Sequence, residues 1–366
     1  MRVAIVSDTV DDVNGVAIGL RRLVDASRRA GHSIQLIGAA RAGVQDDVVR
    51  IPSALDASLP FYPDMTWSIP ELPPLVQHLA RTADIVQLAT PGPMGIAGLI
   101  AGRMLDLPVI AQYHTEVAEY AARMTGLPML RGIVEPIVGW FYKQAELCLA
   151  PSQAVVDRLR ALGVPAERIQ RIRRGVDLEL FHPMRRVPNA QPTVLYVGRL
   201  SKEKNLDALA AAWTIVHRER PAARLVATGE GPLAGMLAKL PNAVETGPRY
   251  GEDLARTFAS ADVFAFPSET ETFGNVVVEA AASGLPAIVA AGGAAHEHVV
   301  DGTTGLVATG AEPLARAIIR LLDDPDLRAR MGIAARAHAT SYALDHAVRA
   351  TWDIYRSIPL HMKAAS

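Results

Sequence analysis

Short apolar segments alternate with longer helical patterns along this chain, and this alternation constrains the fold more than any other feature. In the first half the apolar segments are residues 2–7, 33–38, 84–89, 108–114 and 146–150. Strands that are apolar on both faces and separated by helices are typical of a parallel sheet covered on both sides. We therefore predict an α/β first half built on a parallel sheet.

The pattern then starts again. Residues 182–193, HPMRRVPNAQPT, are rich in proline and charge and are typical of a linker. A last helix is expected from about 344 to 356, with Trp352 and Tyr355 on its apolar stripe. The apolar segments of the second half are residues 193–198, 224–229, 262–266, 286–291 and 305–308. The sequence thus predicts two α/β halves, about 1–182 and 193–340.

Composition narrows the class of protein. The 366 residues fit two domains of about 150 residues each. A net charge of −1 gives no reason to expect a nucleic-acid partner. The single cysteine, Cys148, excludes a disulfide within the chain and argues against a Cys-based zinc site. With no signal-peptide pattern and no apolar run of ~18–20 residues, we expect a cytoplasmic protein.

Two loops that follow predicted strands carry features suited to an anion. Parallel sheets bind ligands beyond the carboxyl ends of their strands. Asn14 and Gly15 end such a loop and open a helix, whose N-terminal amides favour an anion. Arg199 and Lys204 follow another strand, and two cations suit a diphosphate. The alternatives are an ordinary turn and solvated surface charges; Lys202 is expected to be the exposed lysine.

The most informative segment is 267–284. A polar loop containing Glu271 leads into an apolar helix that carries Glu279, eight residues later. At 1.5 Å rise per residue, Glu279 lies ~8–9 Å along the helix from its start. This span suits a ligand with an anion at the helix start and hydroxyl groups near both carboxylates. The alternative is that Glu271 caps the helix and Glu279 pairs with a neighbouring cation.

His114 ends the apolar segment 108–114, where a side chain of this type can serve as an acid, a base or a hydrogen-bond donor. The alternative is a structural histidine whose hydrogen bonds are satisfied within the fold.

Three other motifs are weaker. HEH at 296–298 lacks metal-site spacing and is interpreted as a surface loop, and GEGPLAG at 229–235 misplaces the third glycine of a dinucleotide loop. DDPD at 323–326 is interpreted as a helix stop and an N-cap.

Together these motifs resemble the retaining glycosyltransferases of the glycogen-synthase-like family 4, and the resemblance runs nearly end to end. Its most specific part is the E-x7-E motif from Glu271 to Glu279. YHTE at 113–116, followed by Tyr120, is most similar to bacterial α-mannosyl-, glucosyl- and sulfoquinovosyltransferases that act on lipids; Gln87 stands where many members have histidine. The other matching motifs are Asn14-Gly15, GH at 31–32, ATPGPMG at 89–95, APS at 150–152, GVDLELFHP at 175–183, GRLSKEKN at 198–205 and GG-x-x-x-E ending at Glu297.

The resemblance implies the GT-B fold, in which two Rossmann-like parallel-sheet domains face each other across a cleft. It implies an acceptor-binding domain over 1–185 and a nucleotide-sugar-binding domain over 186–343. A C-terminal helix within about 344–366 would cross back to the first domain.

The resemblance also implies roles for individual residues. Arg199 and Lys204 would hold the donor diphosphate, Glu271 would contact the transferred sugar, and His114 would help to stabilise the transition state. The remaining donor-binding residues would be Asn14, Gly15, Gly247, Arg249, Phe273, Gly274, Asn275, Val276 and Glu279, with Gly247 and Arg249 beside the nucleobase and Glu279 at the ribose.

The expected reaction is hexose transfer with retention from a nucleotide sugar, GDP-mannose being favoured over UDP-glucose, to a lipid or small-molecule acceptor. No cofactor or metal is expected, because fixed cations and a helix N-terminus can stabilise the leaving diphosphate. The alternatives are a nucleotide-sugar 2-epimerase on the same fold and a non-catalytic nucleotide-sugar binder.

Residues 125–143 mix apolar residues with Arg131 and Lys143, so they are either a surface that rests on the inner face of the plasma membrane or a core helix. The oligomeric state stays open.

Overall fold

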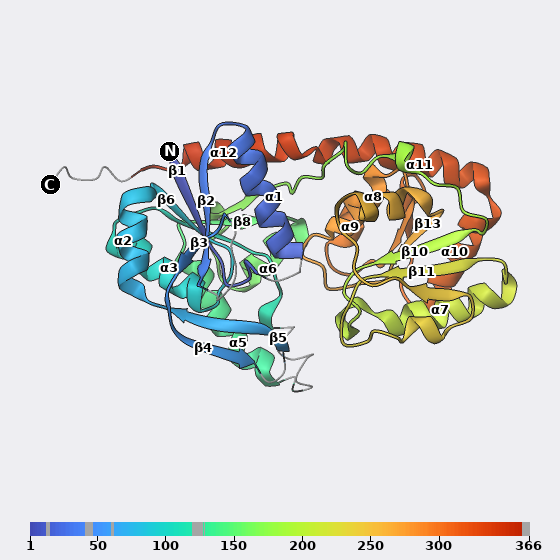
Figure 1. Ribbon diagram of the computed structural model, residues 1–366, viewed down its shortest axis with the longest axis horizontal. Helices are drawn as coiled ribbons and strands as arrows, with labels where there is room; N and C mark the ends of the chain where they lie inside the picture. Colours follow the sequence, from blue (N-terminus) through green and yellow to red (C-terminus); the bar gives the residue numbers. More distant parts are fainter. Residues whose placement is uncertain (12–14, 41–46, 60–61, 119–126, 128, 361–366) are drawn as a thin grey trace. The chain divides into compact units, whose positions relative to one another are not determined.

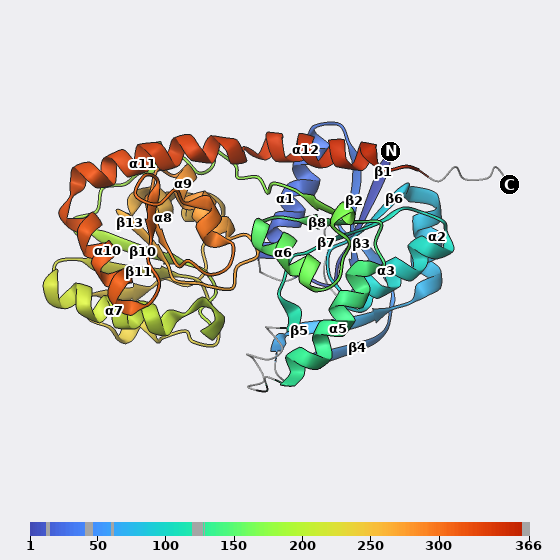
Figure 2. The same cartoon turned by 180° about the vertical axis from the view of Figure 1, so that it is seen from behind.

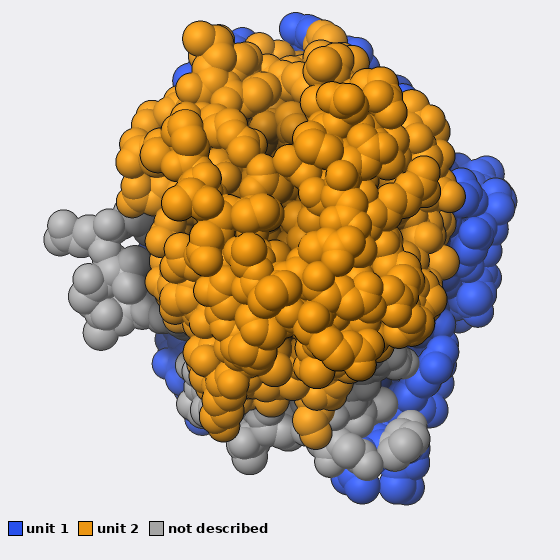
Figure 3. All heavy atoms as spheres, turned by 90° about the vertical axis from the view of Figure 1, so that its right-hand side faces the viewer, with its two compact units in different colours: residues 1–174, 347–366 blue, residues 175–346 orange. Residues whose placement is uncertain are grey.

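The computed structural model describes residues 1–11, 15–40, 47–59, 62–118, 127 and 129–360 of the chain (Figure 1). The chain forms two compact units, coloured separately in Figure 3. Unit 1 comprises Met1–Arg174 and Ala347–Ser366, and unit 2 comprises Gly175–His346. The segment that resembles a linker, 182–193, therefore follows the point at which the chain passes into unit 2.

Unit 1 is built on a seven-stranded parallel sheet with the strand order β3-β2-β1-β6-β7-β8-β9. The central strands are buried along their whole length, as expected for a sheet covered by helices on both faces. The strands are β1 Arg2–Val6, β2 Ser33–Ala39, β3 Val49–Ile51, β6 Ile85–Leu88, β7 Val109–Gln112, β8 Leu147–Ala150 and β9 Ile169–Arg171. The helices are α1 Gly15–Arg29, α2 Leu72–Thr82, α3 Pro93–Met104, α5 Met129–Lys143 and α6 Gln153–Ala161. An antiparallel pair, β4 Ser53–Leu59 and β5 Tyr62–Pro70, is added to this unit.

Unit 2 is built on a six-stranded parallel sheet with the order β12-β11-β10-β13-β14-β15. The helices α7 and α10 pack against each other, as the two opposite views show (Figures 1 and 2). The strands are β10 Thr193–Val197, β11 Arg224–Thr228, β12 Ala243–Glu245, β13 Val263–Phe266, β14 Ala287–Val289 and β15 Gly305–Val307. The helices are α7 Leu206–Glu219, α8 Gly251–Ser260, α9 Asn275–Ala282, α10 Ala311–Asp323 and α11 Pro325–Ala339.

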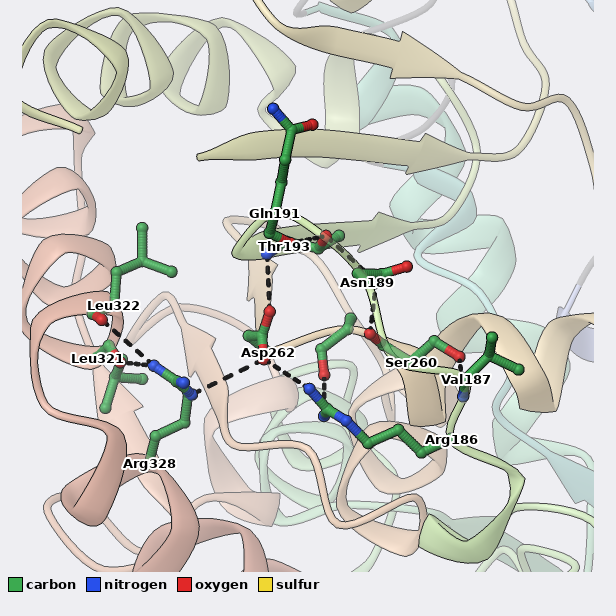
Figure 4. Close-up of polar contacts among 11 residues, drawn as sticks. Arg186, Val187, Asn189, Gln191, Thr193, Ser260, Asp262, Leu321, Leu322 and Arg328 are labelled. Atoms are coloured by element: carbon green, nitrogen blue, oxygen red, sulfur yellow. Dashed lines mark hydrogen bonds and ion pairs between the residues drawn. The ribbon is translucent and has the colours of Figure 1, made fainter. Parts of the chain in front are cut away.

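The linker-like segment is bound to the body of unit 2. The buried carboxylate of Asp262 accepts hydrogen bonds from Arg186 Nη2 and from the Thr193 amide, each at 2.8 Å (Figure 4). Asn189 Nδ2 donates to the carbonyl oxygen of Ser260 at 2.6 Å. Because both charged and backbone groups are paired, this part of the chain is held along the sheet edge where β10 and β13 begin.

The last helix, α12 Leu344–Ser357, packs on unit 1 beside α1 (Figures 1 and 2). The indole nitrogen of Trp352 donates to Ser27 Oγ at 3.0 Å. The hydroxyl of Tyr355 donates to Gln87 Oε1 at 2.5 Å, and Gln87 Nε2 donates to Gln112 Oε1 at 2.9 Å. A fully buried polar chain thus joins the last helix to the two central strands β6 and β7.

The fold predicted from the sequence is confirmed in its class: two parallel sheets with covering helices and a last helix that packs on the first unit. Most of the predicted strands end one or two residues too late, whereas the predictions 146–150 and 262–266 end at the observed residue and β2 extends one residue beyond its prediction. The short strands β3 and β12 and the β4–β5 pair were not predicted. Their sequences contain proline or lack a continuous apolar run, so neither strand pattern is strong in them.

Replacing Tyr355 by phenylalanine tests the role of the buried polar chain. The change removes the hydroxyl donor and leaves Gln87 Oε1 buried without it, which costs about 1–3 kcal/mol. We expect the free energy of unfolding in urea to fall by that amount. Tyr250→Phe is the control, since that side chain is half exposed. Equal unfolding free energies for wild type and Tyr355→Phe would contradict the assigned role.

Candidate active site

Two loops of unit 2 meet because β10 and β13 are parallel neighbours, so both strands end at the same edge of the sheet. The β10 loop carries Arg199 and Lys204, and the β13 loop carries Glu271. Lys204 Nζ lies 2.5 Å from Glu271 Oε1, although the two residues are 67 apart in the sequence. Ser268 Oγ donates to the same carboxylate oxygen at 2.9 Å. The lysine and the glutamate are only 15% and 14% exposed, so this ion pair lies largely out of water.

Helix α9 begins directly after this loop. Its N-cap is Gly274, with φ of 88°, a backbone conformation that favours glycine, and no side chain caps the helix from that position. The first helical residues, Asn275 and Val276, are partly exposed, so their amides lie near the surface at the positive end of the helix. The Glu271 carboxylate is bonded to Lys204 and Ser268.

Glu279 lies within α9 and is 5% exposed, between the buried residues Val278 and Ala280. It is four residues after Asn275, so the two side chains share one face of the helix. A carboxylate held at this depth in an apolar helix requires polar partners, because burying an uncompensated charge is costly.

Glycines set the position of the Arg199 loop. A Cβ atom on Gly229, which follows β11, would lie 1.9 Å from the carbonyl oxygen of Gly198, and one on Gly231 would lie 2.4 Å from that of Leu200. The β11 loop therefore packs backbone against backbone on the β10 loop. The motif at 229–235 has this packing role rather than that of a dinucleotide loop. The Tyr196 hydroxyl also donates to the Arg199 carbonyl oxygen at 2.8 Å.

The Glu271 loop is supported in the same way from β14. A Cβ atom on Gly293 would lie 2.8 Å from both the Glu269 carbonyl oxygen and the Glu271 nitrogen. The amide of Ala294 donates to the carbonyl oxygen of Glu271 at 2.8 Å. The paired glycines of the GG-x-x-x-E motif thus allow the β14 loop to bind the backbone that carries Glu271.

His298 holds the last part of this loop. It is 4% exposed, with Nε2 at 2.7 Å from the Phe273 carbonyl oxygen and Nδ1 at 3.0 Å from the Tyr342 hydroxyl. A carbonyl oxygen only accepts, so Nε2 carries the hydrogen and Nδ1 accepts from Tyr342. Burial lowers the pKa of His298 to about 4. The interpretation of 296–298 as a surface loop is therefore wrong for His298. That interpretation followed from the spacing of metal-site motifs, and such spacing gives no information on whether a side chain is buried.

Gly247 and Arg249 follow β12, at the opposite end of the strand order from β15. Gly247 has φ of 72°, and its carbonyl oxygen accepts from the Gly229 amide at 3.1 Å. Arg249 is exposed, and its Nη1 donates to Thr257 Oγ1 at 2.8 Å. These residues lie at the same sheet edge as Arg199, with the β11 loop between them.

In unit 1, His114 follows β7 and is 6% exposed. Its Nδ1 contacts Nη2 of Arg174. Burial and the positive charge of Arg174 together hold the pKa of His114 well below its ordinary value. Gly15 is the first residue of α1, and Asn14 lies outside the described residues.

The loop that carries His114 is tied down by a charged network. Arg158 of α6 donates from Nε to Glu116 Oε2 at 3.1 Å and also bonds to Glu135 of α5. The Tyr113 hydroxyl interacts with both Glu116 and Arg158, and burial raises the pKa of Tyr113.

Sequence patterns indicated neither Arg158 nor Arg174 nor Tyr342, since each is an ordinary helix or loop residue whose role depends on long-range contacts.

Two family models match this chain. The model described as "Glycosyltransferase Family 4" matches residues 13–180, and the model described as "Glycosyl transferases group 1" matches residues 191–324.

The chain is also similar to curated proteins and solved structures. It is 35% identical over 326 residues to a "GDP-mannose-dependent alpha-mannosyltransferase" of Mycobacterium tuberculosis, covering 84% of this chain and 83% of the relative. A protein of the same name from Mycolicibacterium smegmatis is 35% identical over 356 residues, 92% of each chain. An Anabaena protein determined in complex with UDP and glucose superposes with a TM-score of 0.77 at 19% identity, covering 98% of this chain and 100% of the other.

Replacing His298 by glutamine tests the support of the Phe273 carbonyl. Because the folded-state pKa of about 4 lies below the ordinary 6.5, the unfolded chain binds the extra proton first as the pH falls. The stability that His298 contributes is therefore present above pH 6.5 and is lost as the pH falls towards 4. Between pH 7.5 and 5.0 the free energy of unfolding of wild type should drop by about 2 kcal/mol more than that of the variant.

Urea unfolding followed by circular dichroism at both pH values measures this difference. His346→Gln, which changes an exposed histidine of unit 2, is the matched control and should follow wild type. Parallel pH dependences for wild type and His298→Gln would show that His298 is not held neutral in the folded state.

Proposed function

Since this chain belongs to glycosyltransferase family 4, we propose that it transfers mannose from GDP-mannose to a hydroxyl group of a lipid or small-molecule acceptor, with retention at the anomeric carbon. The glycosyltransferase activity follows from the family. The names of the mannosyltransferase relatives support the donor. The observation that carries the proposal is the Lys204–Glu271 contact beside the start of α9. A cation, a carboxylate and helix amides therefore lie together at the carboxyl edge of the sheet.

The first proposed step is stabilisation of the leaving diphosphate. Negative charge develops on the phosphate as the bond to the anomeric carbon breaks. Arg199 and Lys204 would bind that charge, and the amides of Asn275 and Val276 at the start of α9 would add their positive end. The amides are fixed by the fold of α9, and Lys204 would exchange its contact with Glu271 for one with the phosphate, so cationic groups would be available where the charge develops. We therefore propose that no divalent metal ion is needed.

The two carboxylates of the E-x7-E motif would bind hydroxyl groups. Glu271 lies beside Lys204 and would contact the transferred sugar, while Glu279 lies further along α9 and would contact the ribose. Gly247 and Arg249 would flank the base, and His114 would lie near the sugar. The nucleotide sugar is thus proposed to lie along the carboxyl edge of the unit 2 sheet.

Retention has two chemical routes. A double displacement needs a carboxylate free to attack the anomeric carbon. Glu271 already accepts hydrogen bonds from Lys204 and Ser268, which makes it a poor nucleophile. We therefore favour attack of the acceptor hydroxyl from the face that the diphosphate leaves, with the proton passing to the departing phosphate oxygen.

The second candidate function is a nucleotide-sugar 2-epimerase. It would turn over the nucleotide sugar with no acceptor present, whereas the proposed transferase requires one. UDP-glucose is the second candidate donor. Thermal unfolding with each nucleotide sugar separates the donors, because a ligand that binds the native state raises its melting temperature.

Substituting the two cations tests the proposed diphosphate site. We expect the double variant Arg199→Met, Lys204→Met to lower kcat/KM for GDP-mannose by at least ~10³-fold, because each lost charge contact removes roughly 2–4 kcal/mol. Lys202→Met is the control, since Lys202 is exposed and precedes Lys204 by two residues. Transfer assays with EDTA should match those without it. Near-normal turnover by the double variant, or strict dependence on a metal ion, would contradict the proposed mechanism.

A second proposal concerns the acceptor side. Helix α5 buries Val138, Phe141 and Tyr142 in unit 1, so one of its faces is a core face. Its other face presents an exposed apolar stripe spaced by four, four and three residues: Met129, Ile133, Ile137 and Trp140, between 46% and 70% exposed. Exposed Arg131 and Lys143 flank this stripe.

We propose that the α5 stripe rests on an anionic bilayer. An amphipathic helix of this kind gains from burying its apolar face at the headgroup boundary and from attraction between its basic residues and acidic lipids. The inner face of the plasma membrane carries such lipids. Among the described residues, no helix combines the length and apolarity required to cross a bilayer, so contact would be peripheral.

Co-sedimentation with vesicles of phosphatidylglycerol and phosphatidylcholine tests this contact. Wild type should sediment with mixed vesicles and less with phosphatidylcholine alone. The variant Ile137→Gln, Trp140→Gln should lose most of the binding, because each apolar side chain contributes roughly 1.5–3 kcal/mol when buried. Ile333→Gln, at another strongly exposed isoleucine on α11, is the control. Unchanged sedimentation of the α5 variant would contradict the role of the stripe, and a wild type that does not sediment with mixed vesicles would favour a soluble acceptor.

A further inference from the structure

His114 contacts Arg174, a residue that lies outside the motifs described in the sequence analysis. Arg174 lies 60 residues further along the chain, beyond β9, and its Nη2 contacts Nδ1 of the buried imidazole. Arg174 is also the last residue of unit 1 before the chain enters unit 2. The contact therefore joins the strand-end loop of β7 to the segment that leaves the sheet after its edge strand.

The chemistry of the two groups determines where the imidazole hydrogen lies. A guanidinium group has only donors and keeps its charge at any pH that a protein experiences. The ring nitrogen that meets it must offer a lone pair, so Nδ1 bears no hydrogen. The single hydrogen of a neutral imidazole then lies on Nε2. A second proton would place two positive charges in contact within the protein interior, which is costly.

We propose that Arg174 is a positioning residue that holds His114 as the neutral Nε2–H tautomer, so that His114 acts as a hydrogen-bond donor and not as an acid or base. The assignment of the tautomer does not depend on the proposed function. Only its consequence for sugar transfer rests on that function. A neutral donor would stabilise charge on a sugar or phosphate oxygen without giving up a proton.

The surroundings of His114 agree with this assignment. The carboxylate of Glu116, two residues later, is engaged by Arg158. Burial and Arg174 are the causes that lower the pKa of His114, and both act against the protonated form. A purely structural role for Arg174 predicts that its loss changes stability but leaves the tautomer of His114 as it was.

Nitrogen NMR of protein labelled with ¹⁵N-histidine distinguishes these roles and needs no substrate. His114 is assigned by the signals that disappear in His114→Gln. In wild type we expect an unprotonated Nδ1 and a protonated Nε2 with no titration between pH 5 and 8. A His114 that titrates near its ordinary pKa of about 6.5, or that carries its hydrogen on Nδ1, overturns the proposal with no variant needed.

The variants extend the test. Arg174→Met should raise the pKa of His114 and mix its tautomers, whereas Arg174→Lys, which keeps a cationic donor, should restore much of the wild-type spectrum. Arg173→Met is the control, because Arg173 is the exposed neighbour of the same charge. An unchanged His114 spectrum in a folded Arg174→Met protein overturns the proposal.

Kinetics connect the tautomer to transfer. With GDP-mannose, Arg174→Met should lower kcat by at least about tenfold, with a smaller change in KM and a loss of activity at low pH that begins at a higher pH than in wild type. In a His114→Gln background the same change should cost less than about twofold, because Arg174 acts through His114. Equal losses in both backgrounds overturn the positioning role. The expected NMR result without any turnover of GDP-mannose would instead count against the proposed function alone.

Discussion

The pairing of β10 with β13 is the constraint on which the candidate site depends. Parallel neighbours end at one edge, so the loops after them are brought together whatever their distance in sequence. This places Lys204 and Glu271 in contact at 2.5 Å across 67 residues. Both side chains are largely buried, and each compensates the charge of the other. Neither could be held there alone without a large desolvation cost.

Backbone packing then gives these loops a defined shape. Gly229 and Gly231 admit the carbonyl groups of the β10 loop, and Gly293 admits those of the β13 loop. At each of these positions a Cβ atom would meet backbone, which has little freedom to move aside. His298 completes the arrangement by donating to the Phe273 carbonyl oxygen. Close contacts between main chains thus support both loops, and the His298 side chain holds the backbone just before α9.

Sequence patterns predicted what depends on local composition. Apolar runs such as 193–198 and 262–266 identified the strands, and the loops after them contain Lys204 and Glu271. What could not be predicted depends on partners far away in the chain. Tyr355 bonds to Gln87, and His298 bonds to Phe273 and Tyr342, through contacts that no spacing rule encodes. The β4–β5 pair was missed because β5 contains proline and β4 has no continuous apolar run.

The resting ion pair also bears on how the proposed site selects its ligand. A donor that separates Lys204 from Glu271 must supply a new partner to each, since an uncompensated buried charge costs about 3–5 kcal/mol. In the proposed function a nucleoside diphosphate alone offers an anion to Lys204, whereas the hydroxyl groups of the transferred sugar are the donors proposed for Glu271. A nucleotide sugar offers both. We infer that, if the proposed donor site is correct, the pair favours the complete donor over its diphosphate product, and re-formation of the pair would assist product release once the sugar has been transferred.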